Sequence, residues 1–200
     1  MVLPRNYDPA KEYPAVLAFG GGGQTMDVVD SMIQRQFQQE AEKRGYIVVS
    51  PAAPDGELFV FEGGEKVFPG FLTRILADYK IQENKFHVAG RSNGGISAFH
   101  IAARHPQYFL SITAFPGYLT ELTPSRLKAV STMCIYMHVG ELDSDWRAQM
   151  MDQSEFFREE GMKVQFIVED GQEHSIETLT GPGSARLFDH FDEARRGCGT

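Results

Sequence analysis

A serine stands among glycines where an apolar stretch ends. In FHVAGRSNGG, residues 86–95, Ser92 has Gly90 two residues before it and Gly94 two residues after it. This spacing fits G-x-S-x-G, in which a strand turns directly into a helix and the crowded flanking positions must be small. A serine held in such a turn can act as a nucleophile, because the helix N-terminus favours developing negative charge. The alternative is a plain loop, since the pattern alone is common by chance.

A nucleophilic serine needs a base, and the base needs an acid that orients it. VEDGQEHSI places His174 just after an apolar run, and HVGELDSDW places Asp143 and Asp145 just after another. Asp143 is favoured because it follows Gly140 at the usual loop distance, although either aspartate could instead cap a helix. The resulting chain order, Ser92, Asp143 and His174, is that of one fold among the convergent catalytic triads.

The other histidines are weaker candidates for the base. His87 and His138 lie within strand patterns, so we expect them in the core. The remaining three belong to expected helices: His100, His105 and His190. His174 alone follows the carboxyl end of an expected strand, and its alternative interpretation is a solvated loop histidine.

Four consecutive glycines, residues 20–23, follow the first apolar run. Glycine lets backbone N–H groups approach a ligand closely. A dinucleotide-binding fingerprint would need glycine where Thr25 stands, and the Gly-Lys-Ser/Thr of a phosphate-binding loop is absent. We therefore favour an oxyanion hole formed by the N–H of Asn93 and one from Gly21 or Gly22, over a loop that merely turns.

Three aromatic residues near the strand ends are candidates for the wall of a substrate pocket: Phe19, Tyr118 and Trp146. Each is equally compatible with a place in the core. Trp146 is the favoured one, because it closely follows the loop that carries Asp143.

Short apolar runs alternate with longer amphipathic stretches along the chain. The apolar runs are rich in β-branched and aromatic residues, as expected of strands buried on both faces: 15–20, 46–51, 86–90, 109–115, 133–140 and 163–169. The spacing of apolar residues predicts these helices: 26–44, 69–79, 94–104, 145–160 and 183–196. Such alternation indicates an α/β protein with a parallel, doubly wound sheet, whose ligands bind beyond the carboxyl ends of the strands.

Composition limits the possible partners. The 200 residues are 42% hydrophobic and 23% charged, which predicts one globular domain spanning residues 1–200. The formal net charge of −8, without a cluster of Lys and Arg, argues against a nucleic-acid partner. No apolar run approaches the ~20 residues of a membrane span. The first residues lack the apolar core of a signal peptide, which favours the cytoplasm, although a processed chain would look the same.

The two cysteines, Cys134 and Cys198, suggest no disulfide framework and no metal site. Cys134 lies in an apolar strand pattern and is expected in the core. Cys198 lies in a glycine-rich tail, where we expect a free, exposed thiol.

Taken together and in order, four segments resemble the α/β-hydrolases, and specifically the compact phospholipase/carboxylesterase and polyhydroxybutyrate-depolymerase-like esterases. The segments are LPRNYDPAKEYPAVLAFGGGG, GRSNGG, VGELDSDW and GQEHSI, and the resemblance runs from about residue 3 to residue 190. It implies a serine carboxylic-ester hydrolase that forms an acyl-enzyme on a small-molecule ester, with no cofactor and no metal. A peptidase, a thioesterase or a non-catalytic binding module of the same fold is the alternative.

The sequence departs from those families in ways that predict structure. Phe19-Gly20 stands where they usually have His-Gly, and the match begins late in their pattern. The antiparallel opening strands would then be largely missing, leaving six main strands in the order 2-1-3-4-5-6. Only 17 residues separate Phe115 from Met133, too few for a cap domain, and 55–68 is expected to be a mobile rim loop. An open cleft suits short or soluble esters, while the sequence leaves the oligomeric state open.

Overall fold

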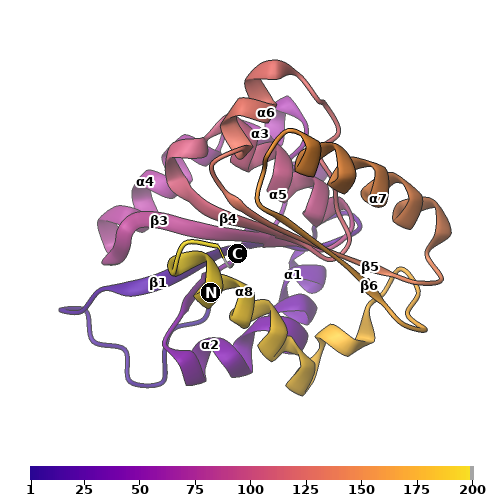
Figure 1. Ribbon diagram of the computed structural model, residues 1–200. Coiled ribbons are helices and arrows are strands. Elements are labelled where there is room, and N and C mark those ends of the chain that lie inside the picture. The colour runs from indigo at the N-terminus through magenta and orange to yellow at the C-terminus, as the bar shows by residue number, and fades with distance from the viewer. Residues whose placement is uncertain (199–200) are drawn as a thin grey trace.

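The computed structural model describes residues 1–198, which contain a six-stranded parallel sheet in the order β2-β1-β3-β4-β5-β6 (Figure 1). Every named strand pairing in it is parallel. The strands are β1 Tyr13–Phe19, β2 Ile47–Val49, β3 Ile81–Gly90, β4 Phe109–Ala114, β5 Cys134–Gly140 and β6 Val164–Glu169. The predicted fold class and strand order are confirmed.

Helices cover both faces of the sheet. Helices α1, α2 and α8 lie on one side and α4, α5, α6 and α7 on the other (Figure 1). The α-helices are α1 Met26–Met32, α2 Gln38–Arg44, α3 Glu62–Glu65, α4 Phe68–Asp78, α5 Asn93–Arg104, α6 Pro124–Val130, α7 Ser144–Glu159 and α8 Ala185–Arg195. Among residues 1–198, none of the helices combines the length and the apolar character that crossing a membrane requires.

Alternation along the central strands produces two apolar layers. In β1, Leu17 points into the layer shared with α4, α5 and α7, whereas Val16 points into the layer shared with α1, α2 and α8. All seven residues of β5 are buried, which explains its continuous apolar sequence. Outside the sheet, Val2 forms an isolated antiparallel bridge with Val48.

The long helical pattern at 26–44 is broken in the middle. A π-helical turn, η1 Ile33–Phe37, separates α1 from α2. Its residues repeat the apolar spacing that predicted one helix, so the pattern gave no sign of the wider turn. Such turns are often found at functional sites.

The segment 55–68, where we expected a rim loop, carries regular structure. It contains the end of the 3₁₀ turn Pro54–Gly56, all of α3 and the first residue of α4. Phe59 is fully buried between Phe19 and Phe68, at ring-centroid distances of 5.2 and 5.1 Å. The charges and glycines in the sequence obscured this apolar anchor.

The prediction for the cysteines is wrong in one respect. Cys134 is buried, as expected, but it forms a disulfide with Cys198 instead of leaving a free thiol. Their Cα atoms are 5.4 Å apart although 64 positions separate them in sequence. The pairing exists because α8 returns the chain to the start of β5, where Ala194 packs with Cys134. A pair defined only by tertiary structure leaves no local sequence signal.

Candidate active site

Ser92 occupies a strained turn between β3 and α5. Its φ of 57° and ψ of −123° are unusual for a residue with a side chain. A Cβ on Gly90 would collide with the carbonyl oxygen of Gly94, and a Cβ on Gly94 would collide with that of Phe19. These backbone contacts are the physical reason for glycine at both flanking positions.

The backbone around Ser92 is fixed by the segment that follows β4. The Ser92 N–H donates to the carbonyl oxygen of Pro116 at 2.8 Å. A Cβ on Gly95 would collide with the same carbonyl oxygen. The next N–H belongs to Asn93, the first residue of α5, where helical N–H groups lack an acceptor within the helix.

Ser92, His174 and Asp143 come together from three different loops. His174 Nε2 lies 2.8 Å from Ser92 Oγ, and His174 Nδ1 lies 2.7 Å from Asp143 Oδ2. Because a carboxylate only accepts, Nδ1–H donates to Asp143 and Nε2 is left to accept the hydroxyl proton of Ser92. The His174 side chain is 42% exposed and that of Asp143 12% exposed, so the imidazole can meet a substrate while its acid is shielded.

Asp145 has a different environment from Asp143. It is exposed in the first turn of α7, and its carboxylate accepts a weak hydrogen bond from Ser144 at 3.4 Å. Of the two candidate acids, the structure brings Asp143 to the imidazole.

The loops that carry Asp143 and His174 are bonded to each other. The Leu142 N–H donates to the carbonyl oxygen of Gln172 at 2.8 Å, and a Cβ on Gly140 would collide with the same carbonyl. The side-chain oxygen of Gln172 in turn accepts the backbone N–H of Glu177 at 2.9 Å. Gln172 therefore shapes the turn that presents His174, a role that the sequence did not suggest.

A buried charged network lies beneath the same loop. Glu169, at the end of β6, accepts hydrogen bonds from His138 at 2.8 Å, from Arg186 at 2.7 and 2.8 Å, and from Thr178 at 3.0 Å. Burial alone would raise the pKa of the Glu169 carboxyl, but the hydrogen bonds from His138 and Arg186 outweigh it and hold the pKa at about 2. The sequence places His138 in the core, as observed, but does not reveal its partners.

The network ends in a pair of neutral histidines. His138 Nε2 lies 2.8 Å from His190 Nε2. Burial lowers the pKa of His138, and it lowers that of His190 to about 3. Because Nδ1–H of His138 donates to Glu169, its Nε2 must accept, and His190 is the donor.

The glycine run passes beside Ser92. A Cβ on Gly21 would lie 3.5 Å from Ser92 Cβ, close but not overlapping. Gly22 has a positive φ of 53°, and its carbonyl oxygen accepts the side-chain amide of Asn93 at 2.9 Å. The three candidate oxyanion residues are thus neighbours of the serine, and the loop is tied to α5.

Gln24 fixes the far end of this loop. It is fully buried with a positive φ of 53°, a conformation that is uncommon for a residue with a side chain. Its amide nitrogen donates to Ser97 at 2.9 Å, and its amide oxygen accepts the N–H of Phe59 at 3.1 Å. Gln24 therefore joins the glycine loop to α5 and to the segment 55–68, a role that only the structure reveals.

The three candidate wall residues separate into two groups. The Trp146 ring meets His174 edge to face at 4.9 Å between centroids, and Tyr118 packs on Trp146 at 5.2 Å. Phe19 has no exposed surface and packs against Phe59 and Phe68. Its alternative interpretation as a core residue is therefore the right one, because its side chain lies entirely within the apolar layer.

No group of three or more His, Cys, Asp and Glu side chains within residues 1–198 is arranged to hold a metal ion.

No model of a known protein family matches the sequence, and no curated protein matches it either. Solved structures do match the fold. A thermostable esterase aligns with 97% of this chain and 57% of its own, at 17% identity and a TM-score of 0.72. The chain thus spans little more than half the length of that protein.

Two further solved structures match over most of the length of both this chain and their own. An S-formylglutathione hydrolase from Agrobacterium tumefaciens aligns over 98% of this chain and 88% of its own, at 18% identity and a TM-score of 0.67. A ferulic acid esterase aligns over 96% and 88%, at 20% identity and a TM-score of 0.69. Together with the strand order and the strained turn at Ser92, these matches establish that the chain has the α/β-hydrolase fold.

Proposed function

We propose that this protein is a serine ester hydrolase that works through an acyl-enzyme. The observation that carries the proposal is the continuous hydrogen-bond chain from Ser92 Oγ through His174 to Asp143, with distances of 2.8 and 2.7 Å. Two hydrogen bonds of this length, on loops after different strands, are the arrangement that activates a serine. The names of the structural neighbours, an esterase, an S-formylglutathione hydrolase and a ferulic acid esterase, support the same class.

In the first half of the reaction, Ser92 Oγ bonds to the ester carbonyl carbon while His174 Nε2 takes the hydroxyl proton. Asp143 stabilises the imidazolium that forms. The carbonyl oxygen becomes an oxyanion, which the N–H of Asn93 and one from Gly21 or Gly22 receive. The carbon–oxygen bond then breaks, and the alcohol leaves with the proton from His174.

In the second half, water attacks the acyl-enzyme. His174 takes a proton from the water, the new tetrahedral intermediate collapses, and the proton returns to Ser92 Oγ as the carboxylic acid leaves. The cycle thus balances with one water consumed and no redox change.

Short or water-soluble esters suit the surroundings of Ser92. Residues 115–133, all of which the structure describes, contain helix α6 and otherwise irregular chain, instead of a cap domain. Trp146 lies beside His174 and Tyr118 packs on Trp146; both are half-buried and would form an apolar wall for the substrate.

A fluorophosphonate probe tests the proposal, because it reacts with an activated serine. We expect wild-type protein to be labelled at Ser92, as located by mass spectrometry of the digested protein. Ser92→Ala should abolish labelling, whereas Ser131→Ala, a matched change at an exposed serine on the far end of α6, should leave it intact. Unlabelled wild-type protein that also fails to hydrolyse p-nitrophenyl acetate would indicate a non-catalytic module. If the wild-type protein is labelled, its rates on a matched oxygen ester, thioester and amide separate an esterase from a thioesterase or peptidase.

A further inference from the structure

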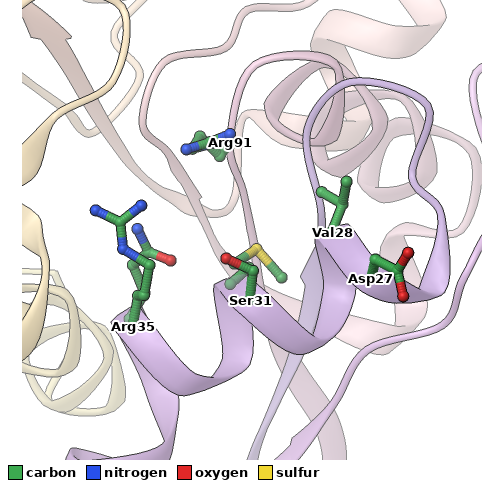
Figure 2. Close-up of a pocket in the computed structure, with 7 residues that line it drawn as sticks. Asp27, Val28, Ser31, Arg35 and Arg91 are labelled. Atoms are coloured by element: carbon green, nitrogen blue, oxygen red, sulfur yellow. The ribbon is translucent and has the colours of Figure 1, made fainter.

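A pocket of about 210 Å³ lies immediately beside Ser92, on the side of the sheet covered by α1. Figure 2 shows Arg91, the residue before Ser92, across the pocket from α1, which carries Asp27, Val28 and Ser31. The complete lining is Asp27, Val28, Ser31, Met32, Arg35, Gln36 and Arg91. We call it the arginine pocket.

Gln36 places an amide at the wall of the arginine pocket. The residue as a whole is only 3% exposed, and its side chain makes no hydrogen bond to the other residues of 1–198. Its amide is not among the side-chain groups that are fully buried without a partner, so its polar atoms reach the open space of the pocket. There the amide can donate to a ligand or accept from one.

The π-helical turn provides a second, independent reason to regard the pocket as a built site. Arg35 and Gln36 both belong to η1. A π turn takes more residues than an α turn, so it changes which side chains of the helix face the pocket. Such turns are frequently found at functional sites.

The charges in the arginine pocket favour an anion. Arg35 and Arg91 each supply a guanidinium, and in Figure 2 the Arg35 guanidinium points toward Arg91. Arg35 forms an ion pair with Glu177, while Arg91 forms none with the other residues of 1–198. Asp27 lies at the other end of the pocket from Arg35 (Figure 2). A carboxylate between the guanidiniums would meet charge-assisted donors at one end of the pocket.

The arginine pocket is connected to the candidate active site through Gly21. A Cβ at Gly21 would lie 3.3 Å from Arg91 Nε and 3.5 Å from Ser92 Cβ, so this backbone position touches both. On the other side, Glu177 lies three residues beyond His174 and contacts Arg35. The arginine pocket therefore adjoins the loops that carry Ser92 and His174.

We infer that the arginine pocket binds a carboxylate carried by the ester substrate, so that the preferred substrates are esters with a negatively charged end. This inference rests on the proposed function of Ser92. It adds what the hydrogen-bonded triad does not provide, namely the class of ester that is selected.

Two esters that differ only in charge test the inference: p-nitrophenyl hydrogen adipate, with a free carboxylate, and p-nitrophenyl methyl adipate. We expect wild-type kcat/KM to be higher for the anionic ester, and the ratio of the two values to fall as salt is added. Arg91→Gln and Arg35→Gln should each lower this ratio about ten-fold, the usual effect of losing a hydrogen bond to a charged group.

Two control variants isolate the effect of the arginine pocket. Arg74→Gln removes an exposed arginine on α4, on the other face of the sheet, and should leave the ratio unchanged. Glu177→Gln removes the carboxylate that pairs with Arg35 and leaves the Arg35 guanidinium charged, so it should maintain or raise the ratio. A ratio near one in wild-type protein, or a ratio that the arginine variants leave unchanged, would overturn the inference. If the neutral ester is still hydrolysed, the proposed function is unaffected by that result.

A binding measurement separates the two proposals if turnover is absent. Titration calorimetry of Ser92→Ala protein with monomethyl adipate, with dimethyl adipate as the neutral control, needs no reaction. Binding of the monoanion that is lost in the Ser92→Ala, Arg91→Gln double variant supports the arginine pocket even if neither ester is hydrolysed. Equal binding of the charged and neutral ligands, or binding that Arg91→Gln does not weaken, contradicts it.

Discussion

Two histidine–carboxylate pairs in this molecule have almost the same geometry and different surroundings. His174 meets Asp143 at 2.7 Å, and His138 meets Glu169 at 2.8 Å. The second nitrogen of His174 faces the hydroxyl of Ser92, with the ring 42% exposed. The second nitrogen of His138 faces another neutral histidine, and its ring is fully buried. A short pair therefore does not by itself identify a catalytic base, and the role proposed for His174 rests on the partner of its remaining nitrogen.

The largest expected effect tests that distinction at the two histidines. His174→Gln should lower kcat by about 10⁶-fold, because the serine loses its base, while the melting temperature changes little. The matched His138→Gln should retain most of the activity and lose stability instead. Rates on p-nitrophenyl acetate and thermal melts of both variants measure this. Near-normal turnover by pure His174→Gln protein would disprove its role as the base.

The next effect compares the two candidate acids. Asp143→Asn should lower kcat by about 10³–10⁴-fold, because the neutral amide no longer holds the productive tautomer of His174. Asp145→Asn removes an exposed carboxylate two residues further on, in the first turn of α7, and should change kcat less than two-fold. If Asp145→Asn proves the more damaging, the assignment of the acid is wrong.

The third effect concerns the buried pair. Glu169→Gln leaves Arg186 and His138 without their shared carboxylate, which should lower the free energy of unfolding by about 3 kcal/mol; the cost is less than for a fully buried pair because Arg186 reaches solvent. The matched Glu193→Gln changes a more exposed carboxylate on α8 and should cost well under 1 kcal/mol. Urea unfolding measures both, and equal small losses would show that the network contributes little.

The pattern of glycines and apolar runs predicts the parts of the fold that depend on local sterics. Gly90 and Gly94 are needed because a Cβ at either would strike a backbone carbonyl, and this requirement is visible in a single sequence. The six strands are equally visible, since strands buried on both faces are continuously apolar. The serine turn and the six strands are thus predictable from the local sequence, whereas the strand order was expected only from the resemblance to the α/β-hydrolases.

Features that depend on distant partners are not visible in the sequence. Gln24 follows the glycine run and Gln36 lies in an amphipathic stretch, so both look like surface polar residues. Both are nevertheless buried, and the amide of Gln24 is satisfied by Ser97 and Phe59. The Cys134–Cys198 disulfide likewise depends on where α8 ends. In each case the deciding contact joins segments far apart in sequence, so no local spacing encodes it.

The last effect is the pH dependence of stability, which should come from the buried histidines. Burial lowers the pKa of His87 and of His190 to about 3, against an ordinary value near 6.5. Above pH 6.5 both rings are neutral in the folded and unfolded states, so they contribute no slope. As the pH falls from about 6.5 toward 3, the unfolded chain binds protons that the folded protein cannot, and stability is lost.

Each of these rings should add a slope of at most about 1.4 kcal/mol per pH unit below pH 6.5. Glu169 adds to the loss only below about pH 4.5, because its carboxyl stays ionised in the folded state down to a pKa of about 2. Between pH 6.5 and 5 the slope is therefore a property of the histidines alone. Urea unfolding at half-unit steps over this range should show stability falling with pH, and His87→Asn should reduce the slope even though it also lowers the overall stability. If the free energy of unfolding of the wild type did not change over this pH range, the buried histidines would be protonated in the folded protein. The tautomers assigned to the His138–His190 pair would then be wrong.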